Sequence, residues 1–204
     1  LIMLAKYYLE AKLADEVTRI AERVLTKHPQ DPQAEALKIA VVAQQEKIPQ
    51  ALARAEDLYR RHPAEPDTAI LLATLYGHQH RLGEAKSILQ QTLRAHPHHL
   101  DLLNNLKAIL DQAHDNPATE QILRQIAQEE PTIYDHRLKL ARFYDQHLEF
   151  DRAESVLRDA LQAVPDQEQV WLALADFLRL RRGKEAAESA FRQAMEKLPY
   201  STKI

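Results

Sequence analysis

Histidine offers the widest chemistry in this chain, because its imidazole can bind a metal ion or transfer a proton near neutral pH. The sequence holds ten histidines, most conspicuously in the HQH triplet at 78–80 and the HPHH run at 96–99. A metal site needs three or four ligands at about 2.0–2.3 Å from one point. His28, His62 and His96 instead recur at intervals of 34 residues, which places them in successive structural units. We therefore predict structural roles for the histidines, with no metal site and no cofactor.

The basic run RLRRGK, from Arg179 to Lys184, is the strongest charge cluster in the sequence. Cations at the C-terminus of a helix interact favourably with the negative end of the helix dipole, so we expect this run to end a helix. The alternative is a docking patch for an acidic partner or a lipid head group.

The sequence shows no catalytic motif. It has no cysteine, and its three glycines are too few for a phosphate-binding loop that precedes a helix. Neither an HExxH motif nor a nucleophile elbow occurs, and the adjacent Glu129 and Glu130 are expected to lie in solvent at a helix end. We predict that the chain is not an enzyme.

The composition predicts a helical protein with almost no sheet. Hydrophobic residues make up 45% of the chain and charged residues 28%, while glycine, which destabilises helix interiors, is rare. The formal net charge of −3 argues against a nucleic-acid partner, because affinity for phosphate backbones requires clustered Lys and Arg.

The beginning of the chain resembles a first helix rather than a targeting segment. LIMLAKYYLEAK has amphipathic spacing and no initiator Met, basic leader or cleavage site. No run approaches the roughly 20 apolar residues that span a bilayer, so we expect no membrane span in this segment. We expect a piece of a longer protein, with its targeting segment elsewhere, which leaves both cytoplasm and periplasm open.

Proline sets a period along the whole chain. It recurs every 34 residues, at Pro29, Pro63, Pro97, Pro131, Pro165 and Pro199. A fixed period of this length indicates stacked copies of one small unit. We predict a single array over residues 1–204, with units at about 1–29, 30–63, 64–97, 98–131, 132–165 and 166–199.

Each unit carries two amphipathic helices, which must be antiparallel in so short a segment. In the last unit, Trp171, Leu174 and Leu178 share one helical face, and Ala187 and Phe191 share another. The periodic proline ends the second helix, because the residue before a proline is driven out of the α region. A column of small residues lies where bulk would force the two helices apart: Val17, Ala51, Ala85, Thr119, Ala153 and Ala187.

The second unit is the least regular. Lys38 falls in a column that holds leucine in other units, from which we infer one extra residue in the QQEK turn. Pro49 then lies in the first turn of the second helix, where its missing N–H removes no helical hydrogen bond.

The periodic residues of the last unit resemble the signature of the tetratricopeptide repeat, a family with the same period. The residues that carry the resemblance are Trp171, Leu174, Ala175, Leu178, Gly183, Ala187, Phe191, Ala194 and Pro199. The resemblance covers residues 1–199 and is in phase in all six units. It implies an all-α fold, a right-handed superhelical solenoid of helical hairpins whose first helices line a concave groove. It also implies a non-enzymatic scaffold that binds a peptide or partner protein, and the Ala-, Leu-, Gln- and Arg-rich composition resembles repeats in bacterial assemblies.

The face of each first helix that is not used for packing is expected to line this groove, at i, i+4, i+7 spacing. The polar residues that we predict to bind the partner are Lys6, Thr74, Asn104, Asn105, Asp111, Lys139, Arg142, Asp145, Asp176 and Arg179. The alternative is that these are ordinary solvated helix residues with local pairs such as Asp176 with Arg179. The carboxylate clamp of co-chaperone members is matched at Asn105 and Lys139 but not at Ile70, Thr74 and Asp135.

Two further functions are open at this stage. Apolar residues of the terminal repeats, such as Phe191 and Met195, predict a possible homodimer through uncapped ends. A regulatory domain that senses a signalling peptide is the other alternative.

Overall fold

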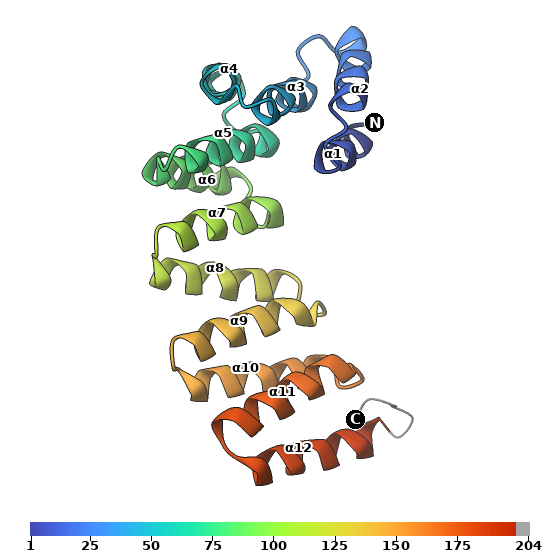
Figure 1. Ribbon diagram of the computed structural model, residues 1–204, viewed down its shortest axis with the longest axis vertical. Helices are drawn as coiled ribbons and strands as arrows, with labels where there is room; N and C mark the ends of the chain where they lie inside the picture. The colour runs from blue at the N-terminus through green and yellow to red at the C-terminus, as the bar shows by residue number, and fades with distance from the viewer. Residues whose placement is uncertain (199–204) are drawn as a thin grey trace. The chain divides into compact units, whose positions relative to one another are not determined.

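The computed structural model describes residues 1–198, which form helices joined by short turns, with no strand in that range (Figure 1). Pro199, the last of the periodic prolines, lies outside the described residues. The helices are α1 (Ile2–Glu10), α2 (Ala14–Lys27), α3 (Pro32–Gln44), α4 (Ile48–Arg61), α5 (Pro66–His78), α6 (Leu82–Ala95), α7 (Leu100–Gln112), α8 (Asn116–Glu129), α9 (Tyr134–Gln146), α10 (Phe150–Ala163), α11 (Glu168–Arg181) and α12 (Lys184–Lys197). The predicted all-α class is confirmed, and two helices fall within each predicted unit.

The periodic prolines follow the second helix of each unit. The helices α2, α4, α6 and α10 each end two residues before a proline. The intervening residues His28, His62, His96 and Val164 have φ between −138° and −131° and ψ between 63° and 82°, outside the helical region. The steric effect of proline on the preceding residue therefore ends these helices.

The column of small residues is buried between paired helices. Val17, Ala51, Ala85 and Ala153 are 0% exposed, and Ala187 is 3% exposed. The small side chains at these positions let the two helices of a hairpin approach closely, because a close-packed interior has no room for larger ones.

The turn inside each of the first five hairpins is built on a residue in the left-handed region. Lys12, Glu46, His80, His114 and Leu148 have φ between 54° and 62°. The sixth hairpin differs: Arg182, at the equivalent position, has a φ of −121°, and the next residue, Gly183, has a φ of 103°, which suits glycine.

The extra residue that we inferred in the second unit is not present. The turn between α3 and α4 has the same length as the turn between α5 and α6, and Glu46 and His80 occupy equivalent left-handed positions. Lys38 occupies the leucine column without a change of register, because its long side chain extends to solvent. There its Nζ lies 3.4 Å from Oε1 of Glu22 on α2. Pro49 lies in the first turn of α4, as predicted.

The chain divides into two compact units, Leu1–Asn116 (unit 1) and Pro117–Ile204 (unit 2). Within unit 1 the first helices stack on one another, α1 on α3, α3 on α5 and α5 on α7. Within unit 2, α9 packs on α11, and the core centres on Leu140, Tyr144, Trp171 and Leu174. In each unit, the first helices therefore form a continuous layer that can present a binding surface.

Candidate functional site

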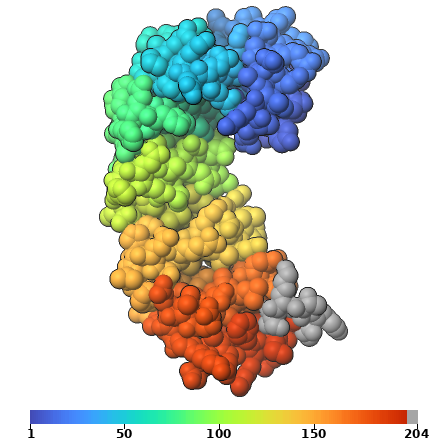
Figure 2. All heavy atoms as spheres, viewed as in Figure 1, coloured from blue at the N-terminus to red at the C-terminus, as the bar shows by residue number. Residues whose placement is uncertain are grey.

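The first helices of unit 1 line a recess of about 390 Å³, which we call the unit 1 groove. Its apolar lining includes Leu9, Leu37, Ile70 and Leu71, and Leu37 is only 5% exposed, so this lining continues into the core. The space-filling view shows unit 1 hollowed between the dark-blue first helix and the green residues of α5 (Figure 2). The polar lining residues are Lys6, Glu10, Gln33, Asp67, Thr74, Asp101 and Asn105.

Asp67 is the centre of a polar network that joins three first helices across this groove. Nζ of Lys6 on α1 donates to Oδ1 of Asp67 on α5 at 2.6 Å. Nε2 of Gln33 on α3 donates to Oδ2 of Asp67 at 2.8 Å and to Oε1 of Glu65 at 3.2 Å. Asp67 also lies in the first turn of α5, where the helix dipole favours a negative charge. The carboxylate is thus fixed in place, with a cation bound to one of its oxygens.

The charge of the unit 1 groove is acidic. Glu10, Asp67 and Asp101 contribute three carboxylates, and Lys6 contributes one ammonium group. Among residues 1–198, no hydrogen-bond donor or cation pairs with the carboxylate of Glu10 or of Asp101. Two of the three carboxylates therefore remain available to a ligand.

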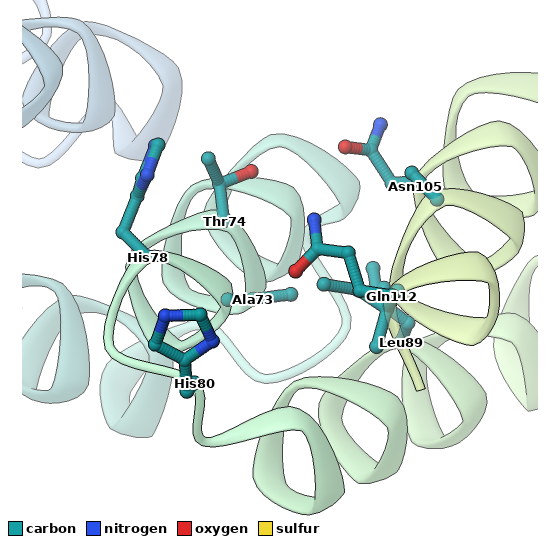
Figure 3. A pocket seen from close by; sticks show the side chains of 10 residues that line it. Ala73, Thr74, His78, His80, Leu89, Asn105 and Gln112 are labelled. Atoms are coloured by element: carbon teal, nitrogen blue, oxygen red, sulfur yellow. The ribbon is translucent and has the colours of Figure 1, made fainter. Parts of the chain in front are cut away.

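A second recess of about 340 Å³ lies between α5 and α7 (Figure 3). Thr74 and Asn105 line both this recess and the unit 1 groove, so the two are neighbours. A Cβ at Gly77 would lie 3.0 Å from Cδ1 of Ile109, so glycine allows α5 and α7 to approach closely here. The remaining polar lining comes from His78, His80 and Gln112.

Unit 2 has a smaller recess of about 220 Å³ between α9 and α11, the unit 2 groove. Its lining is mostly apolar and includes Leu138, Phe177 and Leu180, the last of which is 62% exposed. Its charged lining residues are Arg142, Asp145 and Arg181.

Asp145 and Arg181 neutralise each other at the edge of the unit 2 groove. Nε and Nη2 of Arg181 donate to Oδ1 and Oδ2 of Asp145 at 2.7 and 3.0 Å, a bidentate pair, and this carboxylate raises the pKa of Arg181. Arg142 has no hydrogen bond or ion pair within residues 1–198. The unit 2 groove thus offers a free cation, whereas the unit 1 groove offers free carboxylates.

The basic run at 179–184 ends a helix, as predicted, since α11 ends at Arg181. Arg182 pairs with Asp151 and, at 3.1 Å, with Oε2 of Glu154. Two of its arginines therefore link the end of α11 to other helices of unit 2, and the docking-patch alternative has no support from this geometry.

The structure places half of the predicted partner-binding residues in the lining of a groove. These are Lys6, Thr74 and Asn105 in unit 1, and Arg142 and Asp145 in unit 2. The other five line neither groove: Asn104, Asp111, Lys139, Asp176 and Arg179.

Four of these five residues pair within their own helix. Nζ of Lys107 donates to Asp111 at 2.6 Å, and Arg179 lies 3.4 Å from Asp176. Nζ of Lys139 lies 2.7 Å from Oδ2 of Asp135, and this hydrogen bond lowers the pKa of Asp135. The alternative of local i,i+3 and i,i+4 pairs is therefore the observed arrangement at these positions.

That five of the predicted residues lie outside the two grooves has a geometric cause. In α7 the lining residues are Asp101, Asn105, Ala108 and Gln112, so the lining face is rotated from the predicted Asn104–Asp111 row. One residue turns the helical face by about 100°, so a shift of one position moves a side chain out of the groove. The stacking of each first helix on its neighbour sets this rotation.

The prediction also missed polar lining residues: Gln33, Asp67, Asp101, Gln112 and Arg181. Asp67 lies seven residues, or about two helical turns, before Thr74, so both lie on one face of α5. Following that face two turns toward the N-terminus would have added Asp67 to the predicted residues. The sequence contains no comparable signal for Gln33 or Arg181, whose partners lie more than 30 residues away.

Several histidines have structural contacts. Nδ1 of His99 accepts a bond from the backbone N–H of Leu102 at the start of α7, and Nε2 of His96 lies 2.8 Å from the carbonyl oxygen of Ala64. Across residues 1–198, no group of three or more His, Asp or Glu side chains is arranged to hold a metal ion. In the same range, no helix is both long and apolar enough to cross a bilayer.

Solved structures of tetratricopeptide proteins share this fold. TTC0263, a thermophilic tetratricopeptide protein of Thermus thermophilus, is 22% identical, with a TM-score of 0.59 over 87% of this chain and 96% of that one. YrrB, described as a tetratricopeptide protein with an unusual peptide-binding site, is 14% identical, with a TM-score of 0.56 over 88% of this chain and 93% of that one. MamA is 15% identical, with a TM-score of 0.57 over 78% of this chain and 93% of that one. No curated protein matches the chain.

The family assignment follows from the sequence and is consistent with this architecture. The tetratricopeptide repeat family model matches residues 42–110 and 111–177, which is more than half of the chain. Proteins with this fold act as scaffolds for protein–protein interaction. The chain belongs to the tetratricopeptide repeat family.

Proposed function

We propose that this chain is a scaffold that binds a segment of a partner protein along its first helices, without catalysing a reaction on it. The unit 1 groove carries this proposal, because apolar and polar side chains from four first helices converge on one recess. Binding sites commonly combine an apolar lining, which provides affinity, with a few polar groups that fix orientation. The shared fold with YrrB, which is described as having a peptide-binding site, agrees with this proposal.

The unit 2 groove is the second contact surface in this proposal. It combines the exposed Leu180 and the edge of the mostly buried Phe177 with the unpaired guanidinium of Arg142. A partner segment that carries an apolar side chain next to a carboxylate would complement it, because Arg forms bidentate bonds with carboxylates.

Capture of partners by groove variants tests the proposal. We expect that Asp67→Lys and Arg142→Glu each reduce recovery of partners from a lysate about tenfold, since an opposed charge at a binding surface is repelled. Asp15→Lys and Arg192→Glu are the matched controls, because both side chains are exposed and line neither groove. Cross-linking mass spectrometry of the captured complexes should place the partner on α1, α3 and α5 or on α9 and α11. If all four variants recover the same partners as the unaltered protein, the groove assignment is wrong.

Self-association is a second candidate function, favoured by one observation. The first helix exposes a group of apolar side chains, with Met3 79%, Tyr7 64%, Leu1 62% and Leu4 44% exposed. The occupant that we propose for this face is a second copy of the chain, because apolar groups clustered on a surface gain free energy when two copies bury them.

A further inference from the structure

The unit 1 groove has a polarity that the family fold does not dictate. Its lining holds Glu10, Asp67 and Asp101 against one cation, Lys6, beside the apolar side chains of Leu9 and other residues. Opposite charges across an interface steer the encounter and select the partner, and like charges exclude other partners. The groove is therefore complementary to a ligand that is both basic and apolar.

The Lys6–Asp67 pair shows how the groove holds a cation. The ammonium group of Lys6 lies 2.6 Å from Oδ1 of Asp67, while Gln33 holds the other oxygen at 2.8 Å. The side chain of Asp67 is 17% exposed and that of Lys6 is 38% exposed. The amide of Gln33 thus holds one oxygen of the partly buried Asp67 carboxylate. The other oxygen is directed at a cation in the groove.

Lys6 reaches Asp67 through a long, flexible side chain, so its ammonium group can move away from Asp67 by rotation about the bonds of that side chain. It is the only cation that lines the groove among the described residues, and its partner lies 61 positions away in the sequence. Ordering such a side chain costs conformational entropy, which makes an ion pair at this exposure weak. A ligand cation that also buries apolar surface has an additional source of affinity.

On these grounds, and resting on the proposed scaffold function, we propose that the unit 1 groove binds a basic amphipathic segment of the partner protein. One Lys or Arg of that segment replaces Lys6 on Asp67, and further cations face Glu10 and Asp101. Leucine-type side chains of the segment contact Leu9, Ile70 and Leu71. Lys6 thereby competes with the ligand cation for Asp67. Molecules in which Lys6 occupies Asp67 cannot bind the ligand cation there, so the apparent affinity of the ligand is lowered.

The test measures fluorescence anisotropy of two labelled peptides with the 204-residue chain. The first peptide, LARKLARKLARK, is basic and amphipathic, and the second, LAEELAEELAEE, has the same apolar spacing with carboxylates. We expect the basic peptide to bind and the acidic one to bind at least tenfold more weakly, with an affinity for the basic peptide that falls as salt rises. Equal or tighter binding of the acidic peptide would overturn the inference.

Two variants at the anchor locate the peptide and detect the competition. Asp67→Asn should weaken binding of the basic peptide about tenfold, because a charge-assisted hydrogen bond is replaced by a neutral one. Lys6→Met should strengthen binding about threefold, because the competing ammonium is removed while the stem is kept. The matched controls are Asp15→Asn, which also lies in the first turn of a helix, and Lys12→Met, which lies in a turn, and neither residue lines the groove.

The outcomes separate the basic-segment inference from the scaffold function. If Asp67→Asn weakens binding no more than Asp15→Asn, or Lys6→Met strengthens it no more than Lys12→Met, the Asp67 anchor is refuted. If captured partners cross-link to the unit 1 groove through acidic segments, the scaffold function stands and the basic-segment inference fails. If neither peptide binds and no partner cross-links to this groove, both fail for unit 1.

Discussion

Leu148 occupies a backbone conformation that its side chain disfavours. Its φ is 62°, and its side chain is 72% exposed in the turn between α9 and α10. The left-handed region brings Cβ close to the following carbonyl oxygen, at a cost of about 1–2 kcal/mol for most residues. The other four hairpins of this type place polar residues here: Lys12, Glu46, His80 and His114.

We expect Leu148→Asn to raise the free energy of unfolding by about 0.5–1 kcal/mol, because asparagine tolerates the left-handed region and little buried surface is lost. Chemical denaturation monitored by circular dichroism measures the change. Met195→Asn is the control, since Met195 is 60% exposed within α12, and its replacement should destabilise slightly. A destabilised Leu148→Asn would show that the leucine side chain contributes contacts that outweigh the strain.

At the scale of elements, Tyr144 ties three helices of unit 2 together. Its hydroxyl donates to Oε1 of Glu120 on α8 at 3.0 Å and accepts from Nη2 of Arg152 on α10 at 2.8 Å. Arg152 also bonds to Glu120 directly, and its Cζ lies 4.1 Å from the Tyr144 ring centroid. The hydrogen bonds from Arg152 and then Tyr144 lower the pKa of Glu120, and burial is the main cause of the raised pKa of Tyr144.

Unit 1 contains the same type of network around Tyr76. Its hydroxyl donates to Oε1 of Glu56 at 3.0 Å, and Cζ of Arg81 lies 4.3 Å from its ring centroid. The acid and the arginine stand at different distances along the sequence from the tyrosine in the two networks. The hydroxyl of a buried tyrosine needs a hydrogen-bond partner. In each network that partner is a residue that lies close to the hydroxyl in space, not one at a fixed distance along the sequence.

Glu120→Gln should lower the free energy of unfolding at pH 7 by about 1–2 kcal/mol, because Arg152 and Tyr144 lose a charged partner. A carboxyl group with a lowered pKa in the folded state stabilises the protein above its unfolded pKa, near 4.5, and this contribution is lost as pH falls through the folded pKa. The difference between the two proteins should therefore shrink between pH 5 and about pH 3.

Thermal unfolding followed across this pH range tests the expectation. Asp159→Asn is the control, because Asp159 is exposed and has no hydrogen bond or ion pair within the described residues. Its effect should be small and independent of pH. A Glu120→Gln difference that stays constant from pH 7 to pH 3 would contradict the role given to the charge of Glu120.

At the scale of the whole molecule, stability and function follow from repetition. In a repeat array each hairpin contacts mainly its neighbours, so the core extends by addition of similar interfaces. Unit 1 and unit 2 use this plan with different groove chemistry, free carboxylates in the first and a free guanidinium in the second. The fold therefore sets where the two grooves lie, and the lining residues set the chemistry of each groove.

Self-association belongs to this scale, because it would join whole molecules through α1. If the exposed face of α1 pairs with a second copy, the double variant Met3→Glu, Tyr7→Glu should shift a dimer to a monomer, since buried like charges are destabilising. Multi-angle light scattering across a concentration series gives the mass, and Leu148→Glu is the control, because Leu148 is an exposed apolar residue in a turn of an internal repeat. A strict monomer at every concentration would rule out this function.

The sequence by itself determined the repeat, its helices and much of its core. The periodic prolines, the small column at Val17 to Ala187 and the apolar spacing around Trp171 are local patterns, and local sterics are enough to convert them into hairpins. The irregularity expected near Lys38 was wrong, because a long side chain that reaches solvent can occupy an apolar column without a change of register.

The tertiary structure alone decided which residues meet across each groove. Lys6 and Asp67 are 61 residues apart, and Asp145 and Arg181 are 36 apart, so neither pair leaves a signal in helical spacing. A one-residue difference rotates a helical face by about 100°, which explains why Asn105 lines a groove while Asn104 does not. The rotation of each helix is fixed by packing against its neighbours, and that packing is a property of the assembled stack.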